Sequence, residues 1–253
     1  MFRIAGFLAF ALIASAFVPG GVALAQPGHA GPAADPSKEK DKGEEDRARQ
    51  AVKEFDDASR KATGASEVVA EVEKLAAVRH VLVVQKLCDL VTDNHVDAVN
   101  VAAAKALEHQ GDARAVPALA TALSIHQEKG DEGVLAALLH ALGALKDRRA
   151  GSAVAGFVKY EKSMAVQKAA IEAAGKVRAV EAVDPLLSAL DEASAPPMRR
   201  GTRRLGYKKI PNPKAGLKEP CLAALREITG QSHGTYKEWH DWWSANRSTF
   251  VAK

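Results

Sequence analysis

The residues with the clearest chemistry are eight cations gathered in one short segment. Between Pro196 and Lys218 the chain contains no acidic residue. Arginine binds phosphates and carboxylates in bidentate geometry, and the ring of Tyr207 in the same segment can stack on a base or a sugar. The segment therefore predicts a site for an anionic ligand or an acidic partner surface. The eight cations are Arg199, Arg200, Arg203, Arg204, Lys208, Lys209, Lys214 and Lys218.

The positive charge of the whole chain comes from this segment. The chain has 35 Lys and Arg against 31 Asp and Glu, and Arg3 is the only charged residue among the first 25. The remaining 228 residues therefore carry a net charge of +3, which becomes −5 without the eight cations. One alternative is that the segment folds back onto the acidic remainder and forms weak, exposed ion pairs. Another is a flexible segment that is open to proteolysis. The candidate partner-contacting residues are Arg199, Arg200, Arg203, Arg204, Tyr207, Lys208 and Lys209.

A second candidate is a group of aromatic residues near the C-terminus. Tyr236, Trp239 and Trp243 recur at spacings of three and four, which places them on one face of a helix, with Trp242 beside them. Such a cluster can form a platform for a sugar or a partner. It can also close the exposed end of a helical array, which needs large apolar side chains, and we favour this role.

The sequence offers no recognisable catalytic or metal-binding pattern. Its histidines are scattered, without HExxH or a close His–Cys pair, and there is no GxSxG or glycine-rich phosphate loop. Cys88 and Cys221 belong to distant parts of the chain, whereas a disulfide needs Cα atoms within about 7 Å, so we expect two separate buried thiols. We predict a protein that is not an enzyme and uses neither a cofactor nor a metal.

The first 25 residues resemble an export signal. Arg3 precedes an apolar run from Ile4 to Val18, and Ala23-Leu24-Ala25 is typical of a cleavage site. The run is too short to span a bilayer comfortably, although an uncleaved anchor is the alternative. We therefore predict a signal peptide over 1–25 and an exported protein, periplasmic or secreted, with no transmembrane segment in the mature chain. Residues 26–46, rich in Pro, Gly and charge, are predicted to be a disordered tail.

The rest of the chain repeats a pattern every 32 to 35 residues. Three versions of it cover 97–123, 132–158 and 164–190, so that Leu107 recurs as Leu142 and then as Ala174. Apolar residues within each version follow helical spacing, interrupted by a short turn. Self-similarity at this period predicts stacked helix pairs, because no single pair can bury both of its faces.

The turn carries a resemblance to a known repeat. The run from Gly111 to Pro117, GDARAVP, follows VAAAKAL at 101–107, and this combination resembles the HEAT repeat in its short bacterial, PBS lyase-like form. The resemblance covers about 66–190. It departs at Arg149, Gly151 and Ser152 of the next turn, and at Val180. It implies an all-α, right-handed α-solenoid of about five helix pairs with a long basic loop before the last pair.

The expected organisation follows from these patterns. An N-terminal capping helix and the HEAT repeats cover 47–190, the basic loop covers 191–216, and a terminal HEAT pair with a Trp-rich cap covers 217–253. Ile228-Thr229-Gly230 followed by Trp239 and Trp242-Trp243 resembles a terminal signature of exported, planctomycete-type envelope HEAT proteins.

The expected function is a non-catalytic exported scaffold that mediates protein–protein interaction. The stacked second helices and the basic loop would contact a protein partner of unknown identity. The alternative is a polyanion-binding module that uses the 196–218 segment to bind lipopolysaccharide, acidic polysaccharide or anionic lipid headgroups. A second alternative is an accessory subunit of an enzyme. Nucleic acid is disfavoured as a partner because the leader predicts export.

Overall fold

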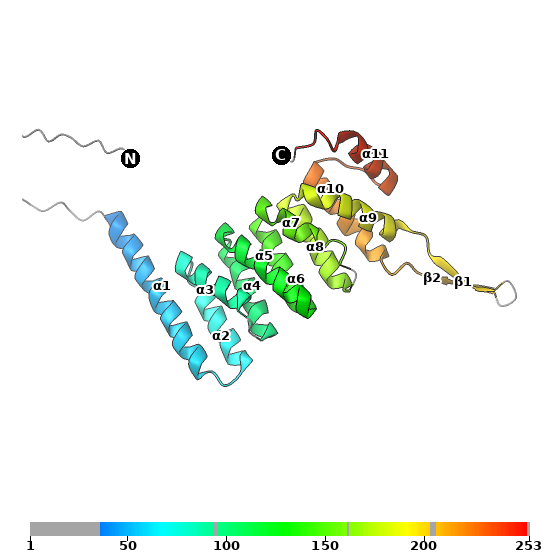
Figure 1. Cartoon of the computed structure of the whole chain (residues 1–253). Helices are drawn as coiled ribbons and strands as arrows, with labels where there is room; N and C mark the ends of the chain where they lie inside the picture. Colours follow the sequence, from blue (N-terminus) through cyan, green and yellow to red (C-terminus); the bar gives the residue numbers. More distant parts are fainter. Residues whose placement is uncertain (1–35, 94–95, 161, 203–205, 252–253) are drawn as a thin grey trace, which may run out of the picture.

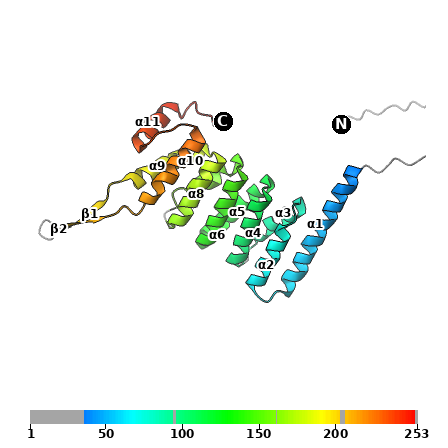
Figure 2. The same cartoon turned by 180° about the vertical axis from the view of Figure 1, so that it is seen from behind.

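The computed structural model describes residues 36–93, 96–160, 162–202 and 206–251, and within 36–40 and 198–209 it describes the backbone. The helices form an elongated array (Figures 1 and 2). After α1 (Pro36–Lys61), five successive pairs follow, as the α-solenoid prediction requires. They are α2 (Ala65–Ala76) with α3 (Val81–Thr92), α4 (Asp97–Gln110) with α5 (Val116–Lys129), α6 (Glu132–Leu145) with α7 (Gly151–Ala155), α8 (Met164–Val177) with α9 (Val183–Ser194), and α10 (Lys218–Thr229) with α11 (Tyr236–Asn246).

Helix α1 covers the N-terminal end of the array, where it packs against α2 and α3. It buries Ala48 and Phe55, and Lys86 of α3 pairs with Asp56 at 2.7 Å. The helix begins at Pro36, so the prediction of a disordered tail over 26–46 is wrong from residue 36 onward. Proline suits the first helical turn, and opposite charges four residues apart, as in the Glu45–Arg49 ion pair, stabilise a helix. Residues 26–35 and the predicted signal peptide lie outside the described residues.

The first helices of the pairs pack directly against one another in series, from α2 through α4, α6 and α8 to α10. Glycine permits the closest of these approaches. A Cβ at Gly143 of α6 would lie 3.0 Å from Cα of Ala173 in α8, and one at Gly175 of α8 would lie 3.0 Å from Cα of Ala224 in α10. Small residues at these crossings bring the helices together and leave Leu and Val side chains to fill the space beside them.

A repeated turn connects the helices within a pair. Gly111 ends α4 with a φ of 68°, and the Asp112 carboxylate then accepts a hydrogen bond from the backbone N–H of Arg114 at 2.9 Å. In the next pair Lys146 takes the left-handed conformation, and Asp147 accepts from the N–H of Arg149 at 2.9 Å. Arg149, which we expected to mark a departure from the repeat, therefore occupies the place of Arg114.

The arginine of this turn also links neighbouring repeats. Arg149 donates to both carboxylate oxygens of Asp147 and, at 2.8 Å, to the carbonyl oxygen of Ala113 in the preceding turn. The third turn has Ala179 at the aspartate position and makes no such cap. The turn sequence thus fixes both the bend inside a pair and the contact between pairs.

The segment predicted as a basic loop over 191–216 contains regular structure. Helix α9 extends to Ser194, and β1 (Met198–Thr202) then pairs with β2 (Gly206–Ile210) in an antiparallel hairpin. We call residues 198–210 the basic hairpin. The four prolines of the segment do not interrupt the ladder because they lie outside it, at 196–197, 211 and 213.

Helix α11 closes the C-terminal end of the array. Trp239 is fully buried and its indole N–H donates to the His233 carbonyl oxygen at 3.0 Å. Trp243 is also buried and donates to the carboxylate of Asp184 at 2.8 Å, which ties α11 to α9. The closing role predicted for these aromatics is confirmed for Trp239 and Trp243. In the part of the chain that the structure describes, no helix is both long and apolar enough to cross a membrane.

Candidate interaction sites

The basic hairpin brings most of the predicted partner-contacting residues together on two short strands. The register pairs Arg199 with Lys209 and Arg200 with Lys208, while Tyr207 pairs with Gly201. Like charges at directly opposite positions of a hairpin destabilise it. The hairpin therefore carries a concentration of positive charge that its own folding does not require. Arg203 and Arg204 lie outside the described residues.

The base of the hairpin is fixed to α9 by one amide. The side-chain nitrogen of Asn212 lies 2.7, 3.2 and 3.2 Å from the carbonyl oxygens of Glu192, Ala193 and Ala195. The first two carbonyls belong to the last turn of α9 and the third to Ala195, which follows it, so the amide caps the C-terminal end of the helix. Lys214 pairs with Glu192 at 2.6 Å, so this cation belongs to the base of the hairpin.

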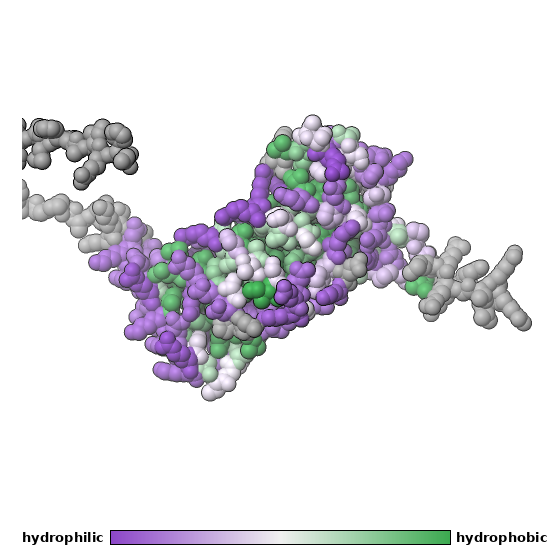
Figure 3. Space-filling model, viewed as in Figure 1, coloured by the Kyte–Doolittle hydropathy of each residue, from purple (hydrophilic) through white to green (hydrophobic). Residues whose placement is uncertain are grey.

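The hairpin extends away from the helices in both views of the molecule (Figures 1 and 2). The hairpin therefore does not fold back onto the array, which was one alternative considered from the sequence. Figure 3 shows hydrophilic residues over α1 and along the edges of the face seen in Figure 1, with intermediate and hydrophobic residues across the middle of the array.

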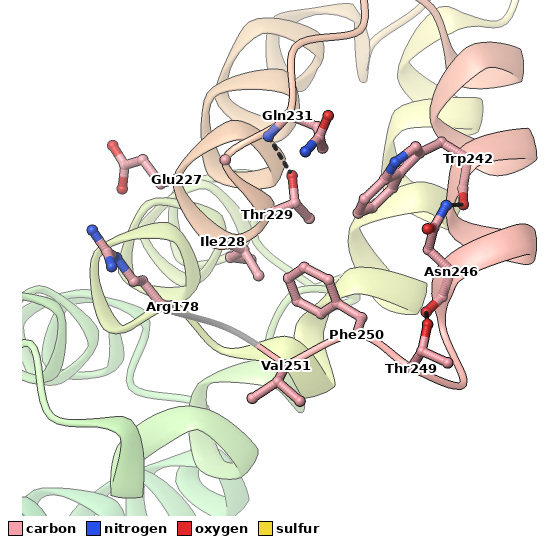
Figure 4. A pocket seen from close by; sticks show the side chains of 11 residues that line it. Arg178, Glu227, Ile228, Thr229, Gln231, Trp242, Asn246, Thr249, Phe250 and Val251 are labelled. Atoms are coloured by element: carbon pink, nitrogen blue, oxygen red, sulfur yellow. Dashed lines mark hydrogen bonds between the residues drawn. The ribbon is translucent and has the colours of Figure 1, made fainter.

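A pocket of about 510 Å³ lies at the C-terminal end of the array (Figure 4). Its walls come from the end of α8, the end of α10, α11 and the segment after it, so residues distant in the sequence meet there. Trp242 and Phe250 supply aromatic walls. The lining side chains are those of Arg178, Glu227, Ile228, Thr229, Gln231, Trp242, Asn246, Thr249, Phe250 and Val251. We call this the C-terminal pocket.

A smaller groove of about 300 Å³ runs along the surface where α2 packs against α4. Its lining includes small side chains such as Ala76, Ala98 and Ala102, together with the charged residues Glu73 and Lys105. The groove is mostly apolar and is open on the surface formed by the first helices.

Neither cysteine is suited to nucleophilic chemistry. Burial raises the pKa of the Cys221 thiol to about 12. Burial, together with the negative charges of Asp89 and Asp112, raises the pKa of Cys88 to about 11. Both are free thiols, as predicted, but only Cys221 is buried, whereas Cys88 is partly exposed. Among the described residues, no group of three or more His, Cys, Asp and Glu side chains is placed to hold a metal ion.

The structure also joins three polar residues that the sequence analysis did not connect. Nδ1 of His126 lies 2.9 Å from a carboxylate oxygen of Asp131, and Nε2 lies 3.5 Å from the amide nitrogen of Asn100. His126 is 1% exposed and Asn100 is fully buried, so no substrate can reach the ring. This cluster links α4 to the end of α5 and serves the packing of the repeat. In the sequence, the only sign of this cluster was that Asn100 and His126 are polar residues at positions where the helical repeat is otherwise apolar.

Comparison with known proteins agrees with this architecture. A family model described as "HEAT repeats" matches residues 122–205, and one described as "PBS lyase HEAT-like repeat" matches residues 99–124. No curated protein matches the sequence. A chain in the solved complex of CpcE and CpcF of phycocyanin lyase from Nostoc sp. PCC7120 is similar in fold, with a TM-score of 0.51 and 16% identity over 91% of this chain and 77% of that one. The matched family models show HEAT-type repeats over residues 99–205, and the stacked helix pairs with their repeated turn show an all-α solenoid.

Proposed function

We propose that this protein is a non-catalytic, exported interaction scaffold that binds an acidic protein partner through the basic hairpin. The observation that carries the proposal is the hairpin itself: a cationic element, anchored to α9 by Asn212, that extends away from the solenoid (Figure 1). The candidate contacts are the residues predicted from the sequence, Arg199, Arg200, Arg203, Arg204, Tyr207, Lys208 and Lys209.

Energetic considerations support a partner for the hairpin. A two-stranded hairpin is marginally stable by itself, and the two like-charge pairs in its register weaken it further. A negatively charged surface would neutralise both pairs and form charge-assisted hydrogen bonds with the arginines. Binding to such a surface would therefore be more favourable in free energy than binding through the same contacts made by uncharged side chains.

The repeat architecture supports a protein as the partner. Solenoids expose long surfaces made by successive repeats, and such surfaces commonly bind other proteins. The solved structure of similar fold is a complex of two protein chains, CpcE and CpcF. Export is supported by the leader-like sequence of residues 1–25, and it places the partner in the periplasm or outside the cell.

The test is capture of partners by the mature chain from a native cell-envelope extract at low and high salt. The hairpin variant changes Arg199, Arg200, Arg203 and Arg204 to Ser. The control changes four exposed cations outside the hairpin to Ser, giving the same net charge: Lys53, Lys61, Arg79 and Lys237. We expect a discrete protein that the control retains and the hairpin variant loses. Equal capture by both variants would contradict the proposal.

Two other functions have observations in their favour. The like-charge pairs of the hairpin also suit a polyanion such as lipopolysaccharide, acidic polysaccharide or anionic lipid. Capture of such a polymer, steeply weakened by salt, would favour that function over a protein partner. The similar structure comes from a phycocyanin lyase, which supports an accessory subunit of an enzyme. Catalytic activity in the captured complex would favour this third function.

A further inference from the structure

Trp242 is the one tryptophan that closure of the array leaves partly exposed. Trp239 is fully buried and Trp243 is 6% exposed, and their indole N–H groups are bonded within the fold. Trp242 is half-buried, and its ring forms a wall of the C-terminal pocket (Figure 4). Packing at the end of the solenoid therefore accounts for two of the tryptophans and leaves the third facing a cavity.

The ring of Trp242 is held in place by other aromatic rings. It meets Trp239 edge-on at a centroid distance of 6.0 Å, stacks on Trp243 at 6.1 Å and meets Phe250 edge-on at 5.8 Å. A side chain fixed in this way loses little conformational entropy when a ligand binds. The pocket thus has a preformed flat apolar surface.

Polar groups with fixed orientation surround this surface. The amide nitrogen of Asn246 donates to the Trp242 carbonyl oxygen at 2.7 Å. The Thr229 hydroxyl donates to the Leu225 carbonyl oxygen at 2.7 Å and accepts from the backbone N–H of Gln231 at 3.1 Å. These bonds orient the amide and hydroxyl side chains along the rim of the pocket.

The charges of the lining balance. Arg178 and Glu227 are its only charged side chains, and both lie on the side of the pocket away from Trp242 (Figure 4). The remaining polar lining consists of uncharged amides and hydroxyls. Such a lining favours a neutral ligand with many hydrogen-bonding groups over an ion.

We propose that the C-terminal pocket binds a neutral saccharide, with one pyranose ring stacked on Trp242. A pyranose has an apolar face of C–H groups and an edge of hydroxyls, which match the aromatic wall and the amide-bearing rim. The volume of about 510 Å³ lies within the range of about 300–1,000 Å³ that is usual for small-molecule pockets. This site is separate from the basic hairpin and does not depend on its function.

The test follows the three tryptophan indole N–H signals of the full mature chain by ¹H–¹⁵N NMR. The probes are glucose, N-acetylglucosamine, galactose and the β-1,4-linked dimers of the first two, at up to tens of millimolar. We expect at least one of them to shift the Trp242 signal in a saturable way, with smaller changes at Trp239 and Trp243. A Trp242→Phe variant assigns the signal.

Two further variants separate binding from folding. Gln231 is exposed on the rim, so Gln231→Ala should leave the fold intact and weaken binding about three- to tenfold, the loss of one hydrogen bond. Lys237→Ala, on the same helix as Trp242 but outside the pocket, should bind like the parent chain. An unmoved Trp242 signal with every probe, or equal affinity of the Gln231→Ala variant, would overturn the proposal.

Discussion

Two glycines of α6 differ in what a methyl group would meet. A Cβ at Gly143 would lie 3.0 Å from the backbone of α8, whereas at Gly133 nothing lies within 4 Å. Alanine in place of an unobstructed helical glycine adds up to about 1 kcal/mol of stability. We therefore expect Gly133→Ala to raise the free energy of unfolding, and Gly143→Ala to lower it by about 1–3 kcal/mol because α6 and α8 must separate. Urea denaturation measures both, and changes of the same sign would contradict this packing.

Lys146 adopts a conformation that glycine prefers. Its φ is 52°, at the place in the repeat where Gly111 has a φ of 68°. A side chain in this region costs about 1–2 kcal/mol. We expect Lys146→Gly to raise the free energy of unfolding by about 1 kcal/mol and Gly111→Ala to lower it by a similar amount. Thermal unfolding of the two variants tests this. A destabilised Lys146→Gly variant would show that contacts of the lysine side chain stabilise the fold by more than its left-handed backbone costs.

The turn carboxylates predict sensitivity to acid. Hydrogen bonds from Arg114 and Arg149 hold the pKa values of Asp112 and Asp147 below their usual range. Because the pKa is lower in the folded state, the stabilisation is present above about pH 4 and is lost as the pH falls through the folded pKa. Stability should therefore decline as the pH falls from about 4 through the lowered pKa values of the folded state.

The control for this effect removes the charge and keeps the cap. Asparagine also caps helix starts, so the Asp112→Asn/Asp147→Asn variant retains the turn. Its free energy of unfolding, measured by denaturation across the same pH range, should fall less steeply than that of the parent. An unchanged slope would assign the acid sensitivity to other carboxylates, such as Glu67 and Glu238, whose pKa values are also lowered by hydrogen bonds.

At the scale of elements, the basic hairpin depends on a single anchoring residue. Asn212 bonds to three carbonyl oxygens at the end of α9, whereas Lys214 contributes a partly exposed ion pair. We expect Asn212→Ala to lower stability by about 0.5–1.5 kcal/mol and to increase hydrogen exchange across 198–210, because the carbonyls at the end of α9 lose their donor. Lys214→Ala should change either quantity little. Equal exchange in both variants would show that the hairpin is held by other contacts.

The helices were predictable from the sequence because their apolar spacing and turn residues repeat. The predicted repeats at 97–123 and 164–190 correspond to α4 with α5 and α8 with α9, and the turn at 111–117 joins α4 to α5. The hairpin was not predicted, since four prolines and a row of cations concealed two strands of five residues. The beginning of α1 was missed because it consists mostly of charged residues and has no apolar pattern.

At the scale of the whole molecule, the two candidate sites differ in how far the sequence reveals them. Charge is visible in a linear chain, so the cations of the hairpin were evident before the structure. The C-terminal pocket was not evident, because its lining joins Arg178 to residues 227–251 across the stacked repeats. Only the aromatic spacing around Trp242 gave a signal there, and the same spacing serves closure of the array.

The central claim is that the basic hairpin contacts a protein partner, and site-directed photo-crosslinking in intact cells tests it most directly. Tyr207, at the paired strands of the hairpin, would be replaced by p-benzoylphenylalanine, which preserves an aromatic ring. The matched control places the same residue at exposed Lys237 on α11. We predict a discrete protein adduct from position 207 and none from position 237. No adduct at 207, or the same adduct from both positions, would contradict the claim.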